Sequence, residues 1–181
     1  MITEFKKFAG FKILWFFVFN PRTEIYINEL AKKLGISPST AKFYCDIFSD
    51  EGIINTERRG NIRFSSLNNA SVYVKELKRL LALLHFKESG IEKISGSSTS
   101  LAIYGSHASG EFEKDSDLDI IVLGKEGDVD KDYVLRFEKK VGKRVQVTVM
   151  PYHKWEIMKK QKDPFALEVL SDNILVSGKR L

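Results

Sequence analysis

The part of the chain that is most informative about the fold is residues 105–120, with the sequence GSHASGEFEKDSDLDI. A short apolar run, Leu101–Tyr104, precedes it, and a second apolar run, Ile120–Leu123, follows it. Runs of about four to eight apolar residues bounded by turn residues are typical of buried strands. Asp117 and Asp119 are two positions apart at the start of the second strand, so their side chains lie on the same face. The stretch therefore predicts a strand, a glycine turn, a spacer and a second strand that carries two carboxylates.

These residue types suit a bound nucleotide and metal ion. Gly105 lets the backbone approach a phosphate closely, and the hydroxyl of Ser106 can donate to a phosphate oxygen. Two carboxylates on one face suit Mg²⁺, which takes oxygen ligands together with substrate phosphates. His107, directly after this pair, could contact a phosphate or could equally be a solvated residue at the start of a helix.

The spacing Gly-Ser, ten residues, Asp-x-Asp resembles the minimal nucleotidyltransferases of the DNA polymerase beta superfamily. The residues that match are Gly105, Ser106, Gly110, Ser116, Asp117 and Asp119. The resemblance implies that Asp117 and Asp119 are catalytic and bind Mg²⁺ or Mn²⁺. It also implies that Gly105, Ser106 and Ser116 bind the phosphates of a nucleoside triphosphate.

A third carboxylate, on a later strand, is also implied by this resemblance. The expected strand is residues 144–150, in which three valines take one face and Gln146 and Thr148 take the other. Gln146 is the counterpart of the missing carboxylate, and a neutral amide cannot act as a base. The nearby acids, Glu111, Glu113, Asp115 and Asp128, fall in loops or spacers. We therefore expect nucleotide and metal binding with weak or lost catalysis.

The first third of the chain has apolar spacing typical of three helices and a hairpin. The expected helices are residues 5–19, residues 27–35 with Asn28 as the N-cap, and a third from Ser37 and Pro38 to Glu51. Gly35 supplies the turn between the last two helices. Apolar and polar residues then alternate over residues 53–57 and 62–65, which predicts two strands with residues 58–61 at the tip of the hairpin.

This order resembles the winged helix-turn-helix family of bacterial and archaeal regulators. The most specific parts are ELAKKLGISPSTA at residues 29–41 and DEGII at residues 50–54. In that family the third helix enters the major groove of DNA and the wing contacts the backbone. The DNA contacts that this resemblance implies are Ser39, Thr40, Lys42 and Phe43 on the helix and Arg58, Arg59 and Arg63 on the wing. Winged helices also serve in protein contacts or dimerisation, and Lys42 is the only basic residue of this helix.

Composition limits the alternatives. The 181 residues have a formal net charge of +5 and a pI near 9.2, which suits a polyanionic partner. The single cysteine, Cys45, excludes an intramolecular disulfide and a cysteine-based zinc site, and its apolar surroundings predict a buried thiol. The longest apolar run, Ile13–Phe19, is too short for a membrane span and no small-residue cleavage site follows it. We therefore expect a cytoplasmic protein that does not enter membranes.

The predicted fold is α+β, with a winged helix-turn-helix over residues 1–68, a connecting helix and linker over 69–97, and a mixed-sheet nucleotidyltransferase-like domain over 98–181. Asn68 or Asn69 is the expected N-cap of the connecting helix, which could pack on either half or mediate dimerisation. The predicted function is a DNA-binding regulator or nucleotide sensor. The alternative is an active transferase that modifies a protein, as related antitoxins do, or an RNA or small molecule. DNA and nucleotide are the expected partners, and a protein partner or a homodimer is possible.

Overall fold

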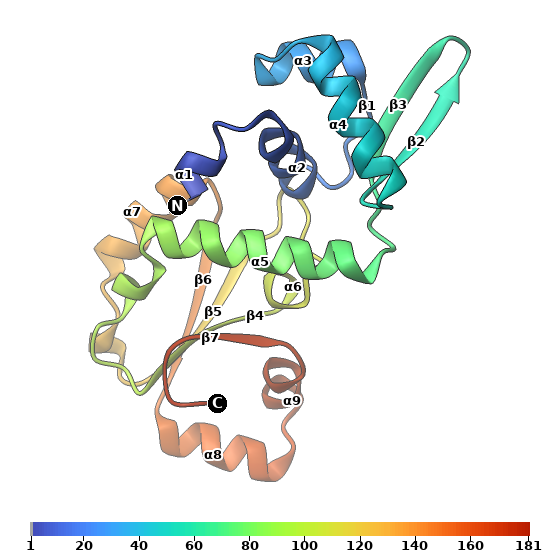
Figure 1. The fold of residues 1–181 in the computed structure, drawn as a ribbon. Coiled ribbons are helices and arrows are strands. Elements are labelled where there is room, and N and C mark those ends of the chain that lie inside the picture. Colours follow the sequence, from blue (N-terminus) through green and yellow to red (C-terminus); the bar gives the residue numbers. More distant parts are fainter. Residues whose placement is uncertain (1) are drawn as a thin grey trace. The chain divides into compact units, whose positions relative to one another are not determined.

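The computed structural model describes residues 2–181 (Figure 1), and it confirms the α+β class. The chain divides into two compact units, Met1–Leu81 and Ala82–Leu181. The boundary falls within helix α5 (Val72–Ser89). None of the helices among residues 2–181 combines the length and the apolar character that crossing a membrane requires.

The first unit combines helices with a small antiparallel sheet. The sheet has the order β1-β3-β2, and Ile25 on β1 pairs with Ser65 on β3. Its core is built from Ile13, Phe17, Leu30 and Cys45 among others, all fully buried. Burial raises the pKa of the Cys45 thiol to about 11, which agrees with the predicted buried position. The elements in chain order are α1 (Ile2–Phe5), α2 (Ala9–Phe19), β1 (Ile25–Tyr26), α3 (Ile27–Leu34), α4 (Pro38–Asp50), β2 (Ile54–Arg59) and β3 (Ile62–Leu67).

The turn between α3 and α4 follows the sequence prediction. Gly35 ends α3 in the left-handed conformation, with φ 64°, which a residue without a Cβ adopts at little cost. Ser37 caps α4 by accepting a 3.0 Å hydrogen bond from the backbone N–H of Thr40. Pro38 occupies the first turn of α4, where its missing N–H costs nothing.

Several local predictions in this unit were wrong. The helix predicted over residues 5–19 begins only at Ala9, because residues 6–8 form a turn in which the backbone amides of Lys7 and Phe8 donate to the carbonyls of Glu4 and Phe5. Helix α3 begins at Ile27 rather than after Asn28, because β1 pairs with β3 up to Tyr26.

The hairpin turn and the cap of α5 also differ from the prediction. Gly60, with φ 63°, and Asn61 form a two-residue turn, so Arg58 and Arg59 belong to β2. The side chains of Asn68 and Asn69 donate to the carbonyls of Gly52 and Pro21 instead of capping α5.

The second unit is built on a four-stranded mixed sheet of order β6-β5-β4-β7. Strands β5 and β6 are parallel, and β4 is antiparallel to both of its neighbours. Strands β4, β5 and β6 lie where the sequence predicts them. The elements that follow α5 are η1 (Ile91–Ile94), β4 (Ser100–Tyr104), α6 (Ser106–Ser109), β5 (Leu118–Leu123), η2 (Glu126–Asp128), α7 (Lys131–Val141), β6 (Val145–Met150), α8 (Tyr152–Gln161), α9 (Pro164–Ser171) and β7 (Asn173–Gly178).

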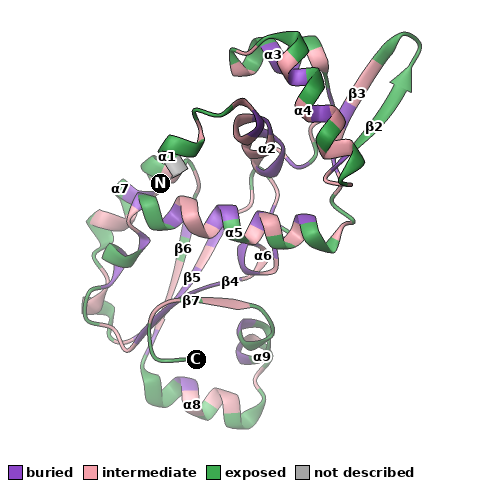
Figure 2. Cartoon of the chain, in the orientation of Figure 1, coloured by how far each residue is buried: buried purple, intermediate pink, exposed green. Residues whose placement is uncertain are grey.

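The sheet is buried along its two central strands, β4 and β5 (Figure 2). On one face, Trp155 of α8 and Val169 of α9 pack against Ile121 and Leu123 of β5. The residues of β5 that alternate with these, among them Leu118 and Ile120, are buried on the opposite face. The side chains of Asp117 and Asp119 therefore point towards the face that α8 and α9 cover.

Helix α5 contributes to the core of each unit along a different part of its length. Val74, near its start, belongs to the core cluster of the first unit. Phe86, near its end, is fully buried and contacts the rings of His107 and Phe137 in the second unit. The hydroxyl of Tyr133 donates a 3.0 Å hydrogen bond to the carbonyl of Gly90, directly after the helix.

Candidate active site

The glycine turn after β4 lies directly against the carboxylate of Asp119. Gly105 has φ 67° and ψ −150°, a combination open essentially to glycine alone. A Cβ at this position would lie 2.8 Å from Oδ2 of Asp119. Glycine therefore allows the loop that begins at Ser106 to stay in contact with the carboxylate.

Ser106 begins the single-turn helix α6, and its side chain is partly exposed. Within residues 2–181 its hydroxyl makes no hydrogen bond, so it is available to a ligand. Its carbonyl accepts from the backbone amides of Glu111 and Phe112, which closes the loop after α6. The loop is thus fixed by its backbone and leaves the serine hydroxyl open.

Asp119 and Gln146 lie in one row across the sheet, and Asp117 lies two residues before Asp119. Tyr104, Asp119 and Gln146 are register partners on β4, β5 and β6. Gln146 Nε2 donates a 2.6 Å hydrogen bond to Oδ2 of Asp117. A neutral amide thus occupies the position on β6 from which a third carboxylate would face the pair.

Ser116 and Lys143 hold the loop that leads to Asp117. The hydroxyl of Ser116 accepts a 2.8 Å hydrogen bond from the backbone N–H of Glu113. Lys143 Nζ donates to the carbonyls of Lys114 and Ser116, at 2.9 and 3.4 Å. Burial lowers the pKa of Lys143, partly offset by Asp115 and Asp117. Sequence reasoning missed this role of Lys143, because the two carbonyls lie 29 and 27 residues earlier in the chain.

The charges that act on Asp119 are all negative. Burial, followed by the charges of Asp117 and Glu168, raises the pKa of Asp119. Glu168 lies on α9, and sequence reasoning missed it because no local motif connects α9 to β5. Uncompensated carboxylates of this kind favour a bound cation.

The residues present fit a divalent metal ion that is bound together with a nucleotide. Among residues 2–181 there is no cluster of three or more His, Cys, Asp or Glu side chains arranged to hold a metal. Asp117 and Asp119 would supply two oxygen ligands, and phosphate oxygens and water would have to supply the others. Mg²⁺ is commonly bound by one or two carboxylates in this way.

His107 contributes to the core instead of to the site surface. Its ring is buried, stacks on Phe112 with centroids 4.6 Å apart, and meets Phe86 edge-on at 5.4 Å. Both alternatives for His107 at the sequence level, a phosphate contact and a solvated residue, were therefore wrong. These aromatic contacts fix α6 against the core of the second unit.

In the first unit, the predicted DNA-contacting residues lie on α4 and on the β2–β3 hairpin. Ser39, Lys42 and Phe43 are exposed on α4, and Thr40 is partly exposed. A groove of about 530 Å³ separates α4 from the hairpin, and Ser39, Lys42, Arg58, Asn61, Ile62 and Arg63 belong to its lining.

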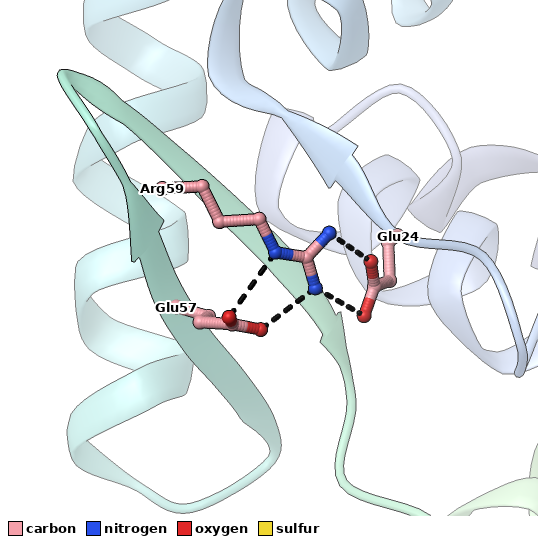
Figure 3. Close-up of polar contacts among 3 residues, drawn as sticks. All are labelled: Glu24, Glu57 and Arg59. Carbon is pink, nitrogen blue, oxygen red and sulfur yellow. Dashed lines mark hydrogen bonds and ion pairs between the residues drawn. The ribbon is translucent and has the colours of Figure 1, made fainter.

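The four cations of this surface differ in their surroundings. Arg59 forms a fork between Glu24, at 2.9 Å, and Glu57, at 2.8 Å (Figure 3). Asp46 binds both Lys42, at 2.8 Å, and Arg63, at 2.5 Å. Arg58 is exposed and has no carboxylate partner in the described part of the chain.

No curated protein matches the chain. The family model of the nucleotidyltransferase domain matches residues 86–176, which include the glycine turn, both aspartates and Gln146. The matched segment is half of the chain and spans the sheet and the site described above. The chain therefore belongs to the nucleotidyltransferase domain family.

Proposed function

We propose that the protein is a DNA-binding regulator whose nucleotidyltransferase domain binds a nucleoside triphosphate with Mg²⁺ and has weak or no transferase activity. The observation that carries this proposal is the 2.6 Å hydrogen bond from Gln146 to Asp117. Transfer of a nucleoside monophosphate requires the acceptor hydroxyl to lose its proton as its oxygen bonds to the α-phosphorus and pyrophosphate leaves. An amide cannot take that proton.

Nucleotide binding itself needs only the residues that remain. Ser106 offers a hydroxyl donor to a phosphate, and Gly105 keeps the loop against Asp119. Asp117 and Asp119 hold the cation that would neutralise the phosphates. These residues are sufficient to bind the nucleotide and the cation, but they do not deprotonate the acceptor hydroxyl.

The order of elements in the first unit supports the winged helix assignment to residues 1–68. Helices α2, α3 and α4 precede the β2–β3 hairpin, and α3 and α4 meet at the tight turn of Gly35. In winged helices the third helix lies in the major groove and the hairpin contacts the DNA backbone.

The distribution of charge supports DNA as the partner. Residues 1–81 contain 13 Lys and Arg against 8 Asp and Glu, whereas residues 82–181 contain 16 of each. The whole formal charge of +5 therefore belongs to the first unit. A net positive unit attracts a polyanion such as DNA.

Glu168 favours a second candidate function, active transfer to a protein, RNA or small-molecule acceptor. Its carboxylate is close enough to raise the pKa of Asp119, so it could accept the proton that Gln146 cannot. In that case transfer would depend on Glu168 of α9 instead of on a carboxylate of β6.

Incubation with labelled nucleoside triphosphates and Mg²⁺ tests both functions. The regulator requires binding without turnover, with binding lost in Asp117→Asn. Labelled product that disappears in both Asp117→Asn and Glu168→Gln would establish the transferase instead. If no nucleotide binds the wild-type protein, both functions are wrong for this domain.

A further inference from the structure

The polar side chains on the exposed face of α4 are already engaged within the protein. The hydroxyls of Ser39 and Thr40 each lie 2.8 Å from the hydroxyl of Ser37, which caps the helix. Lys42 is bound to Asp46, as is Arg63 of β3. The helix is thus left with few polar groups that could reach a base edge without first breaking an internal contact.

Arg, Asn and Gln, which commonly distinguish bases through paired hydrogen bonds, are also absent from α4. Arg or Lys contacts guanine, and Asn or Gln contacts adenine, through pairs of hydrogen bonds in the major groove. The sequence of α4, PSTAKFYCDIFSD, contains no Arg, Asn or Gln, and its one Lys, Lys42, is bound to Asp46. Recognition through such hydrogen bonds is therefore not what this helix offers.

What α4 does expose is apolar. Phe43 is 59% exposed and Ile47, one turn later on the same side of the helix, is 38% exposed. The rings of Tyr44 and Phe43 pack edge-on with centroids 5.2 Å apart, and this contact supports the exposed Phe43 ring. An aromatic side chain in this position can contact the C5-methyl group of thymine, the only apolar group on the base edges of the major groove.

The surroundings of this apolar patch favour a nucleic acid as its occupant. Phe43 belongs to the unit that carries the whole net positive charge. Arg58, which has no carboxylate partner among the described residues, lines the groove between α4 and the hairpin. The first unit thus offers an apolar side chain on α4 for a base edge and an available cation on the hairpin for a phosphate.

We propose that α4 recognises thymine methyl groups through Phe43, so that the protein selects A·T-containing sites by apolar contact. This proposal rests on the DNA-binding function proposed above and names the base feature that determines specificity. The contact requires no change in the internal hydrogen bonds of Ser39, Thr40 or Lys42.

The experiment uses the full chain and duplex DNA. A duplex that binds is first selected from a random pool at low salt, and its dissociation constant is then compared with that of the same duplex carrying uracil in place of thymine. This exchange removes the methyl groups and keeps the base pairing. Wild-type affinity is expected to fall about fourfold for each methyl group contacted. Phe43→Ala is expected to bind the thymine duplex more weakly and to respond little to uracil.

Leu135→Ala is the matched control, because Leu135 is 57% exposed and lies on α7, in the other unit. It should lose affinity for uracil DNA as the wild type does. Equal wild-type affinity for the two duplexes, or an unchanged ratio in Phe43→Ala, overturns the thymine contact while leaving DNA binding intact. Failure of the wild type to bind any duplex overturns DNA binding itself. Self-association that Phe43→Ala abolishes would assign the patch to a second copy and overturn the proposal.

Discussion

Gln146 Nε2 on β6 donates a 2.6 Å hydrogen bond to Oδ2 of Asp117, just before β5. The bond joins a neutral amide to a carboxylate that the family resemblance assigns to a metal ion. It uses one oxygen of Asp117 and adds no negative charge to the site. The segments that lead into β5 and β6 therefore supply two carboxylates, Asp117 and Asp119, where the resemblance implies a third on β6.

Gln146→Asp should supply the negative charge and the base that the amide lacks. We expect the variant to bind a second Mn²⁺ in the presence of a non-hydrolysable nucleoside triphosphate analogue, and to raise turnover at least about tenfold, because a positioned base contributes strongly to proton transfer. Electron paramagnetic resonance measures the bound Mn²⁺ independently of activity. Gln146→Asn, which stays neutral, is the control. If Gln146→Asp gains neither metal nor turnover, the assignment of Gln146 to the third position is wrong.

Gly105→Ala should disturb both stability and nucleotide binding. The new Cβ would meet Oδ2 of Asp119 at 2.8 Å, in a backbone conformation that alanine rarely adopts. We expect a loss of about 1–3 kcal/mol in the free energy of unfolding. Denaturant unfolding and nucleotide titration measure the two effects. Gly127→Ala is the control, since nothing lies within 4 Å of the Cβ that alanine would add there and the φ of Gly127 is not positive. Equal behaviour of the two variants would remove the proposed role of Gly105.

Asp119→Asn should stabilise the unbound protein at neutral pH while weakening metal binding. Burial raises the pKa of Asp119, so the folded state holds its proton more tightly than the unfolded state. Stability of the wild type therefore falls as pH rises through that pKa, and the amide variant escapes the loss. We expect its Tm in the absence of divalent metal to exceed that of the wild type by roughly 1–3 °C, a small effect because solvent screens a half-exposed charge.

The difference in Tm should disappear at acidic pH, below the ordinary range of carboxyl pKa values, where the wild-type carboxyl is protonated in both states. Thermal unfolding across this range provides the measurement, with added Mg²⁺ and nucleotide expected to reverse the order of the two proteins. A gap that stays constant with pH would show that the effect of the substitution is not electrostatic.

Local patterns in the sequence were sufficient for the elements that carry the site. The strands, the Gly105 turn and the shared face of Asp117 and Asp119 all follow from alternation and glycine chemistry between neighbours in the chain. The same reasoning failed for Glu168 and Lys143, because their approach to the aspartates depends on how α9 and the start of β6 pack. It also failed for His107, whose burial is decided by Phe86 and Phe112 together.

The environment of Arg59 could not be predicted for the same reason. Its partner Glu24 lies 35 residues earlier in the chain, and the two meet only because β1 and β2 flank β3. The sequence indicated a wing rich in arginine, and it contained no local signal that would distinguish Arg58 from Arg59. Arg58 and Arg59 should therefore differ in what their loss does to DNA binding.

Arg58→Ala and Arg59→Ala should weaken DNA binding in different ways. Arg58 is available to a phosphate, so its loss should reduce the slope of log affinity against log salt concentration by about one. Arg59 is held by Glu24 and Glu57 and stacks over Phe64 at 5.1 Å, so it fixes the hairpin. Its loss should lower affinity with little change in slope, and should speed hydrogen exchange in β2 and β3.

Glu24→Gln separates the two roles of Arg59, because it removes one carboxylate of the fork and leaves every cation in place. If Arg59 fixes the hairpin, Glu24→Gln should lower affinity and speed exchange as Arg59→Ala does. If Arg59 instead contacts DNA, Glu24→Gln should release it and raise affinity, and Arg59→Ala should reduce the salt slope as Arg58→Ala does. Fluorescence anisotropy across a salt series, together with hydrogen exchange, decides between these outcomes, because only a phosphate contact changes the number of counterions released.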